Sequence, residues 1–470
     1  MDYFTRSRVK SLLDEGKEKS DVIVLGWVRT KRVSKNVAFL EINDGSGLKN
    51  LQVVIEVEDI ERFKLSEINT GASVKVVGNI IKSLGKGQSV EMKPTLIELV
   101  GAAPEDYPLQ KKRHTVEYLR TIAHLRPRTN LFGAANRFRS KMAFAIHKFF
   151  QENGFYYVNT PILTSNDAEG AGETFQVTTL DLDGIAKNGK AVNYEYDFFG
   201  TPTNLAVTGQ LQGEVMATAI GDIYTFGPTF RAEKSNTSRH LSEFWMIEPE
   251  MAFANLSEDV KVAENFLKYL CQYALDNAQE EMELFNKFVD KTHTRISTLE
   301  NIIKSDFETI TYTDAIKILE KASKKAKFQF PVKWGIDLQS EHERYLTEKH
   351  FKKPIAVIDY PKDIKAFYMR LNDDEKTVAA VDVLVPQIGE IIGGSERENR
   401  FDYLERAMIA QNIPMDEEHG LWWYKELRKY GSVPHAGFGL GFARMLMYMS
   451  GISNVRDIIP FPRTPKNSKF

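Results

Sequence analysis

The sequence TFGPTFRAE occupies residues 225–233, and HLSEF follows at residues 240–244 after a polar loop. The first stretch is typical of a strand that ends in Arg231, and the second returns as an aromatic run. Two hundred residues later, HAGFGLGFAR at residues 435–444 combines a glycine-spaced turn with an apolar helix that carries Arg444. Each guanidinium can hold phosphate oxygens through two hydrogen bonds, and the glycines let backbone or base approach closely. Two fixed cations beside such an approach suit a bent triphosphate.

Together these stretches resemble motifs 2 and 3 of the class II aminoacyl-tRNA synthetases. Motif 1 of that family corresponds to FYYVNTPIL at residues 155–163, which follows an amphipathic helix. A glycine turn by itself is most often an ordinary helix cap. Three motifs in the family's order make that simpler interpretation improbable.

Composition places few limits on the chain. Its 470 residues predict two or three domains. The net charge is −2, so any surface that binds nucleic acid must be local. The single cysteine, Cys271, lies in a helical pattern and is expected in a core. Because there is only one cysteine, an internal disulfide and a Cys-rich zinc site are excluded. The first residues lack the apolar core of a signal peptide, and no apolar run approaches the ~20 residues of a membrane span, so we expect a cytoplasmic protein.

Residues 1–100 read as an all-β domain. Five short strands with one helix, predicted at Asp59–Ile68, indicate a Greek-key barrel of the OB type, which commonly binds oligonucleotides. A basic cluster, residues 29–35, falls in the loop between the first two strands, although a solvated charge run explains it about equally well. The predicted strands are Val22–Val28, Ala38–Ile42, Leu51–Val57, Val74–Ile81 and Val90–Lys93.

The rest of the chain predicts an α+β domain. We expect the OB-fold domain at 1–100, a linker or hinge at 101–130 and a catalytic domain at 131–470, with a helical insertion at about 257–353. The strands lack a regular βαβ rhythm, which favours an antiparallel sheet flanked by helices. Predicted helices include Arg137–Asn153, Gln210–Ile220, one capped by Ser257, Asn399–Gln411 and Leu421–Lys429; the later predicted strands are Ile355–Asp359, Ala366–Leu371, Val378–Val385 and Glu390–Gly394.

An OB domain before a class II core is the order of the class IIb aspartyl, asparaginyl and lysyl enzymes. The resemblance implies that the chain activates an amino acid with ATP and passes it to tRNA. The amino-acid carboxylate is the nucleophile, so catalysis consists of alignment and neutralisation of charge. The implied ATP-binding residues are Arg231 at the α-phosphate, Glu233 at the adenine edge, Phe244 stacked on adenine, Arg444 at the other adenine face or the γ-phosphate, and His240 near the phosphates or the tRNA acceptor end.

The resemblance also implies a magnesium site and a pocket for the amino acid. Glu390 aligns with one Mg²⁺ ligand of the family, and Asp382 aligns with the other only if one residue is inserted between them. Glu169 and Gln210 correspond to residues that hold the α-amino group, although Glu173 competes with Glu169 for this role.

The residues around the pocket favour asparagine as the substrate. Aspartyl enzymes carry a lysine shortly after Gln210, and this chain has none. Glu248 as acceptor and Arg397 as donor match a carboxamide, whereas aspartate would meet Glu248 at a cost of about 4 kcal/mol at an effective dielectric constant of about 20. The chain therefore resembles the bacterial asparaginyl-tRNA synthetases, which implies asparagine and tRNA(Asn) as substrates and a homodimer built through motif 1.

The same resemblance assigns anticodon recognition to Phe39, Gln52 and Arg29, with Phe39 stacked on the middle base. On pattern alone, Phe39 fits the barrel core equally well. The alternatives for the whole chain are a non-discriminating aspartyl enzyme, a paralogue that modifies another acceptor, and an inactive RNA-binding paralogue.

Overall fold

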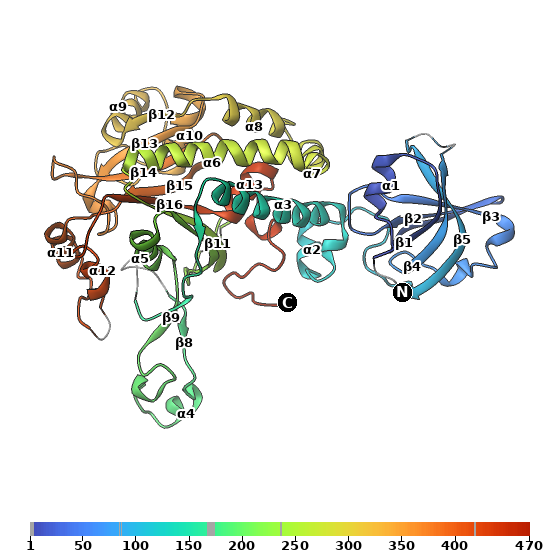
Figure 1. Cartoon of the computed structure of the whole chain (residues 1–470), viewed down its shortest axis with the longest axis horizontal. Helices are drawn as coiled ribbons and strands as arrows, with labels where there is room; N and C mark the ends of the chain where they lie inside the picture. The colour runs from blue at the N-terminus through green and yellow to red at the C-terminus, as the bar shows by residue number, and fades with distance from the viewer. Residues whose placement is uncertain (1–3, 84, 86, 167–173, 236, 418–419) are drawn as a thin grey trace. The chain divides into compact units, whose positions relative to one another are not determined.

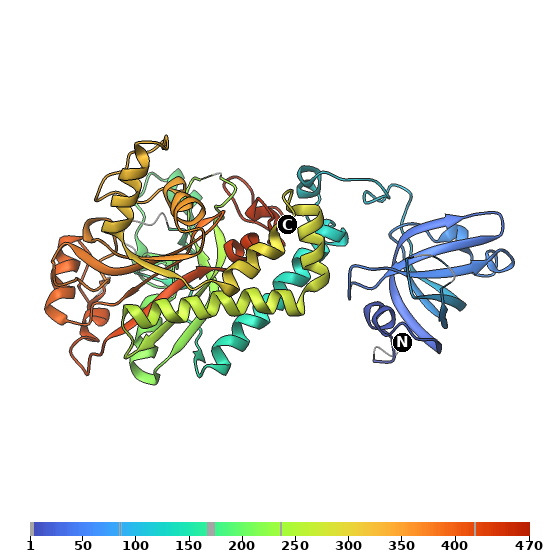
Figure 2. The same cartoon turned by 90° about the horizontal axis from the view of Figure 1, so that it is seen from above.

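The computed structural model describes residues 4–83, 85, 87–166, 174–235, 237–417 and 420–470. The chain divides into two compact units, Met1–Phe138 with Phe470 and Arg139–Lys469. Figures 1 and 2 show the elements of both units, which we describe separately.

The first unit contains a closed five-stranded barrel with the strand order β1-β2-β3-β5-β4 (Figure 1). Alternate residues point inward, so that in β1 Val22, Val24 and Val28 are buried while their neighbours are not. The predicted OB-type barrel is thus confirmed. The predicted helix at Asp59–Ile68 is wrong, because Lys64 takes a left-handed φ of 48° and only short 3-10 turns form there. The elements are α1 (Val9–Glu15), β1 (Lys19–Val33), β2 (Val37–Asn43), β3 (Leu51–Glu56), β4 (Ser73–Lys82), β5 (Val90–Gly101) and α2 (Val116–Thr121).

The second unit is built on an eight-stranded sheet with the order β12-β13-β14-β15-β16-β11-β10-β6. Its central pairs are antiparallel, as predicted, but the outer pairs β12–β13 and β6–β10 are parallel, so the sheet is mixed. The α+β class is confirmed. The strands are β6 (Tyr156–Tyr157), β10 (Ile223–Phe230), β11 (Glu243–Ala252), β12 (Glu308–Thr311), β13 (Ile355–Pro361), β14 (Thr377–Val385), β15 (Gly389–Glu396) and β16 (His435–Gly441).

Helices cover this sheet. The helix α6 packs on β14, β15 and β16, while α5 packs on β10 and β11. In Figure 1, α6 crosses above β15 and β16, and α5 lies below them. The main helices are α3 (Asn130–Glu152), α5 (Gln210–Ile220), α6 (Leu256–Asn277), α7 (Gln279–Leu284), α8 (Arg295–Lys304), α9 (Tyr312–Ser323), α10 (Ser340–Arg344), α11 (Phe401–Ala410), α12 (Trp422–Glu426) and α13 (Phe442–Ser450).

Three local predictions are wrong for physical reasons. The segment Ala366–Leu371 is not a strand, because only Met369 and Leu371 form isolated bridges. The glycine-spaced turn is the strand β16, whose glycines keep the neighbouring strand β11 close: a Cβ at Gly437 would overlap the Pro249 carbonyl oxygen of β11. The cap of α6 lies two residues before Ser257.

The residue that caps α6 is Asn255. Its side chain accepts the N–H groups of Ser257 and Glu258, and the Glu258 carboxylate accepts the N–H of Asn255 at 2.8 Å. This reciprocal arrangement is a capping box, which satisfies donors that the first turn of a helix leaves open.

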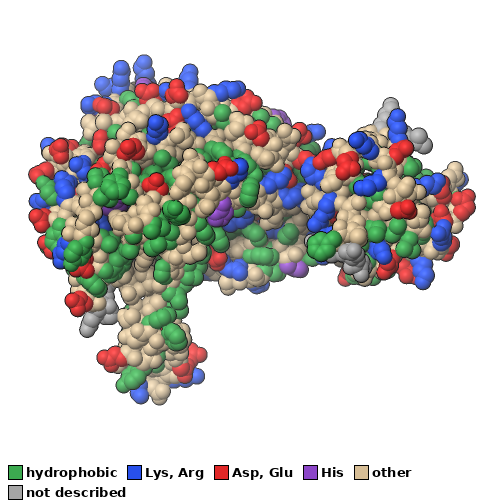
Figure 3. Space-filling view, in the orientation of Figure 1, with side chains coloured by type: hydrophobic (Ala, Val, Ile, Leu, Met, Phe, Trp, Pro, Cys, Tyr) green, Lys and Arg blue, Asp and Glu red, His purple; other side chains and the backbone are tan. Residues whose placement is uncertain are grey.

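A hairpin projects from the second unit at residues 176–203 (Figure 1). Its base is the small sheet β7-β9-β8, and the projecting part carries α4 (Leu182–Lys187). Hydrophobic side chains are visible along it in Figure 3. Within these residues, Tyr196 and Phe198 are exposed. The small strands are β7 (Leu163–Thr164), β8 (Gln176–Val177) and β9 (Thr203–Leu205). Across the described part of the chain, no helix combines the length and apolarity needed to cross a membrane.

Candidate active site

Motif 2 forms the antiparallel hairpin β10–β11. Phe230 pairs with Glu243, and the N–H of Arg231 donates to the Ser242 carbonyl at 3.0 Å just beyond the last strand pair. The guanidinium lies 5.7 Å from the centre of the Phe244 ring. The next strand along from β11 is β16, which continues into α13 and its Arg444. Sheet pairing therefore brings motifs 2 and 3 together although about 200 residues separate them.

These elements enclose a cavity of about 390 Å³. All five residues predicted to bind ATP line it, together with Glu390 and with Arg239, which the sequence did not single out. The Glu390 carboxylate lies 3.8 Å from the Arg444 guanidinium. The polar and aromatic lining residues are Arg231, Glu233, Arg239, His240, Phe244, Ser340, Glu390 and Arg444.

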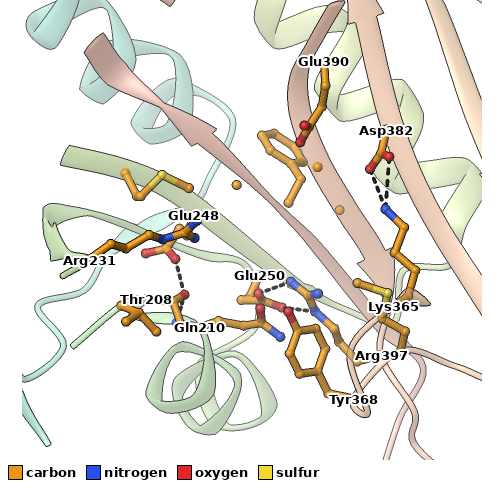
Figure 4. A pocket seen from close by; sticks show the side chains of 17 residues that line it. Thr208, Gln210, Arg231, Glu248, Glu250, Lys365, Tyr368, Asp382, Glu390 and Arg397 are labelled. Atoms are coloured by element: carbon orange, nitrogen blue, oxygen red, sulfur yellow. Dashed lines mark hydrogen bonds and ion pairs between the residues drawn. The ribbon is translucent and has the colours of Figure 1, made fainter. Parts of the chain in front are cut away.

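A second cavity, of about 240 Å³, shares Arg231 and Glu390 with the first, so the two adjoin at these side chains. Figure 4 shows it from close by. It contains the remaining predicted pocket residues that the structure describes, together with side chains that sequence reasoning missed. Its polar and aromatic lining is Thr208, Gln210, Arg231, Glu248, Glu250, Lys365, Tyr368, Asp382, Glu390, Arg397 and Phe438.

Glu248 is a buried acceptor with three local donors. Its carboxylate accepts the Thr208 hydroxyl, the Gly209 N–H at 3.1 Å and the Thr225 hydroxyl at 2.9 Å. The close approach depends on Gly209, because a Cβ there would overlap Thr160 and crowd the carboxylate. The Glu248 carboxylate is therefore held rigidly at the wall of the cavity (Figure 4).

Arg397 is paired with Glu250 rather than with Glu248. Its guanidinium donates to Glu250 at 2.5 and 3.2 Å and to the Ser395 hydroxyl at 2.7 Å. Burial opposes its charge, yet Glu250 holds the pKa of Arg397 above its ordinary value. The sequence did contain a signal for Glu250, since it lies two residues after Glu248 on β11 and so faces the same side of the sheet.

Gln210 is positioned from behind by a buried carboxylate. Its side-chain amide donates to Glu214 at 3.0 Å, and Glu214 also contacts Arg428 at 2.8 Å and His435 at 2.9 Å. Burial opposes the ionisation of Glu214, but Arg428 and His435 hold the pKa of its carboxyl below the usual range. This network fixes the first turn of α5 and with it the amide of Gln210.

Asp382 does not present a free carboxylate. Lys365 donates to both of its oxygens at 3.0 Å, and Asp382 outweighs burial to raise the pKa of Lys365. The two residues are 17 positions apart, and most of the segment between them lacks regular structure, so no local pattern predicts the pair. Glu390 lies on the next strand and lines both cavities, where removal from bulk water and the nearby Asp382 charge raise the pKa of its carboxyl.

The residues fit Mg²⁺ delivered with a phosphate ligand better than a metal held by protein alone. Within the described ranges, no three His, Cys, Asp or Glu side chains are grouped to hold a metal ion. Mg²⁺ keeps several waters and usually takes one or two carboxylates together with phosphates. Glu390, between the two cavities, is suited to that part. Glu169, predicted to hold the α-amino group, lies outside the described residues.

The barrel displays Phe39 on its outer face. The flanking residues Ala38 and Leu40 are fully buried, whereas Phe39 is half-exposed and carries the Arg32 guanidinium 5.8 Å from its ring centre. The alternative that places Phe39 in the core is wrong. Gln52 pairs with Glu41 on the neighbouring strand and points to the same face.

Arg29 lies elsewhere. It is the extra residue of a β-bulge between Val28 and Thr30, which turns its side chain toward the hinge, where it donates to the Arg128 carbonyl. A cavity of about 860 Å³ adjoins it, lined also by Lys111, Lys112 and Arg137.

Comparison with known proteins agrees with this geometry. The chain belongs to the family described as tRNA synthetases class II (D, K and N), which matches residues 115–465, and an OB-fold nucleic acid binding domain matches residues 22–100. The asparagine–tRNA ligase of Synechocystis sp. is 57% identical over 468 residues, covering 99% of this chain and 100% of that protein. The asparagine–tRNA ligase of Acetivibrio thermocellus is 58% identical over 466 residues, covering 98% and 99%.

Solved structures are similar as well. Asparaginyl-tRNA synthetase from Pyrococcus horikoshii, complexed with asparaginyl-adenylate, superposes with a TM-score of 0.83 at 30% identity, covering 98% of this chain and 99% of that one. The Entamoeba histolytica asparaginyl-tRNA synthetase in complex with asparaginyl-adenylate gives a TM-score of 0.79 at 25% identity, covering 96% of each chain.

Proposed function

We propose that this chain activates L-asparagine with ATP and transfers it to the terminal ribose of tRNA(Asn). The observation that carries the proposal is the pair of adjoining cavities. One is lined by arginines and by the aromatic ring of Phe244, and the other by Glu248 and Arg397, an acceptor and a donor that match a carboxamide. Full-length identity of 57% to asparagine–tRNA ligases supports it. We assign the activity to the cytoplasm, where tRNA is charged.

In the activation step, an oxygen of the asparagine carboxylate bonds to the α-phosphorus while the bond to pyrophosphate breaks. Arg231 neutralises charge at the α-phosphate, and Arg444 and His240 hold the outgoing phosphates. Phe244 stacks on adenine and Glu233 accepts from its amino group. In the second step, a ribose hydroxyl attacks the activated carbonyl and AMP leaves.

Magnesium fits this scheme as an ion that binds together with ATP. Glu390 would hold the ion, and Asp382 would lie nearby with its negative charge already balanced by Lys365. The bound ion supplies positive charge to the phosphates. The residues of the chain orient the nucleotide, since Arg231 reaches the cavity from the end of β10 and Arg444 reaches it from the first turn of α13.

The choice of asparagine over aspartate follows from how the charges are paired. Arg397 is balanced by Glu250 and Lys365 by Asp382, so neither offers an uncompensated positive charge to a β-carboxylate. Glu248 can accept a hydrogen bond from the side-chain NH₂ of asparagine, and the Arg397 guanidinium can donate one to the side-chain oxygen of asparagine. Aspartate would place like charges together in a partly desolvated pocket.

We further propose that tRNA is read on the outer barrel face through Phe39 and Gln52, with Arg29 contacting the tRNA backbone near the hinge.

A homodimer through motif 1 is supported by the edge position of β6, where Tyr156 and Tyr157 are exposed, as is Phe144 on α3. Exposed aromatics on an edge strand are expected to be covered by a partner.

The test is ATP–pyrophosphate exchange with each amino acid, followed by charging of tRNA(Asn). Asparagine should support exchange far better than aspartate. Equal rates with both would favour a non-discriminating aspartyl enzyme, and no exchange with any amino acid would favour an inactive RNA-binding paralogue.

A matched variant tests the phosphate role. Arg231→Ala should lower the exchange rate about 10²–10³-fold, because the lost charge acts where charge redistributes in the transition state. A folded variant with a normal rate would contradict the assignment of Arg231 to the α-phosphate.

A further inference from the structure

The short helix α10 places a further acidic side chain against the backbone of Glu390, which lines both cavities. Glu343 is buried, with 8% of the residue exposed, and its carboxylate accepts the backbone N–H of Glu390 at 3.2 Å. The contact requires glycine at the preceding position: Gly389 has a φ of +85°, and a Cβ there would overlap the Glu343 carboxylate. Sequence reasoning assigned no chemistry to this helical region.

The surroundings of Glu343 connect α10 to the predicted ATP site. Charges that act on Glu343 come from Glu390, Asp382 and Arg444. On the same helix, the Ser340 hydroxyl accepts from Arg239 of the motif 2 loop at 3.4 Å, and Ser340 lines the larger cavity. The helix thus contacts both the β14–β15 turn and the motif 2 loop.

We propose that Glu343 is a positioning residue for the magnesium-dependent activation step. By holding the N–H of Glu390, it fixes the backbone from which that side chain extends, and so keeps the Glu390 carboxylate facing the cavity, where it would hold Mg²⁺. The inference rests on the proposed function, in which Glu390 holds Mg²⁺. A buried carboxylate beside another carboxylate is costly for folding, and orienting a ligand is a reason to retain it.

The chain offers a matched control in Glu348. This residue accepts the N–H of Gln387, in the same turn, at 2.8 Å, but it is more exposed and pairs with Arg344 at 2.8 Å. Both glutamates therefore anchor the β14–β15 turn, and only Glu343 anchors the peptide of the proposed metal ligand.

The experiment measures metal binding directly. Mn²⁺ replaces Mg²⁺ as a paramagnetic probe, and its binding to the full-length protein with the non-cleavable α,β-methylene-ATP is followed by electron paramagnetic resonance. Glu343→Ala should raise the Mn²⁺ Kd about tenfold, the effect expected for one lost hydrogen bond to a charged group. Glu343→Gln keeps an acceptor oxygen and should stay within about threefold of the wild type. Glu348→Ala should leave the Kd unchanged.

The Mg²⁺ concentration for half-maximal pyrophosphate exchange should shift in parallel. If Glu343→Ala does not fold, Glu343→Leu, which also lacks an acceptor, takes its place. A native Kd in the folded Ala or Leu variant overturns the proposal, as does a Gln variant that loses as much affinity as Ala.

Glu390→Gln separates the two levels of inference. If it binds Mn²⁺ normally, the metal is not at Glu390 and the proposed site fails. If Glu390→Gln loses Mn²⁺ while Glu343→Ala does not, only the positioning role fails.

Discussion

Single residues define the chemistry of this site through their partners. The sequence indicated Glu248 and Arg397 as pocket residues, and the structure brings both to one cavity with Gln210. The sequence did not indicate that the charge of Arg397 is balanced by Glu250, or that the charge of Asp382 is balanced by Lys365. Those pairs join residues on different strands or loops, and nothing in the local pattern specifies which charges meet.

The rigid setting of Glu248 makes its charge testable. Glu248→Gln keeps the size of the side chain but removes the charge that repels aspartate. We expect kcat/KM for asparagine to fall, because an amide satisfies fewer of the three donors around it. The asparagine-to-aspartate ratio should narrow by about tenfold for each 1.4 kcal/mol of repulsion removed.

The measurement is pyrophosphate exchange with both amino acids for the wild type and the variant. An unchanged ratio would mean that Glu248 does not face the substrate side chain, although the synthetase assignment would stand.

Asp259 is a buried acid without a hydrogen-bond partner on either oxygen, at the start of α6. Burial raises the pKa of its carboxyl to about 7, from 3.8, against the influence of Arg397. The folded state therefore keeps a proton that the unfolded chain releases, so the unfolding free energy should fall as the pH rises from about 4 to about 7.

The effect of Asp259→Asn on the free energy of unfolding should therefore be more stabilising at pH 8 than at pH 5. The expected difference is roughly 2–4 kcal/mol, at about 1.36 kcal/mol per pKa unit. Calorimetric unfolding at both pH values checks this, with the exposed Asp276→Asn on the same helix as control. An equal effect of Asp259→Asn at pH 5 and pH 8 would show that its ionisation does not matter.

At the scale of elements, local signals predicted the structure well and long-range pairing decided the exceptions. Short β-rich segments bounded by turn residues predicted the barrel strands and the strands β13, β14 and β15 of the large sheet. The glycines of residues 435–441 read as a turn, yet their spacing of two is that of a strand packed tightly against β11. Residues 366–371 have a strand's composition but find only isolated partners.

The cap of α6 was present in the sequence as Asn255 followed three residues later by Glu258. Asn255→Ala should lower the unfolding free energy by about 0.5–2 kcal/mol, because two N–H groups of the first turn lose their acceptor. Thermal unfolding of this variant beside Ser257→Ala measures the difference. Similar losses in both variants would point to helix propensity rather than the cap.

At the scale of the whole molecule, tRNA reading and adenylate formation are assigned to different units. The order of predicted strands and helices along the sequence indicated a β-rich unit followed by an α+β unit. Phe39→Ala removes a side chain from the outer barrel face, a stacking contact worth roughly 1–3 kcal/mol. Charging of tRNA should weaken about 5–150-fold while amino-acid activation continues at the wild-type rate.

Both assays on one preparation of the variant make the comparison, with Val54→Ala, whose residue pairs with Phe39 on the same face, as control. Equal losses in charging and activation would indicate damage to the fold rather than to tRNA recognition.

The burial of Cys271 has a practical consequence. Its side chain extends from α6 into the protein core and is buried. Burial raises the pKa of the thiol to about 12, so almost none of it is thiolate at neutral pH. Maleimide and other electrophiles should therefore leave the native protein unmodified. A cysteine introduced at an exposed position such as Tyr196, on the projecting hairpin, would become the one reactive attachment point. The chain is thus naturally suited to single-site dye labelling, by which movements during tRNA charging can be observed in solution.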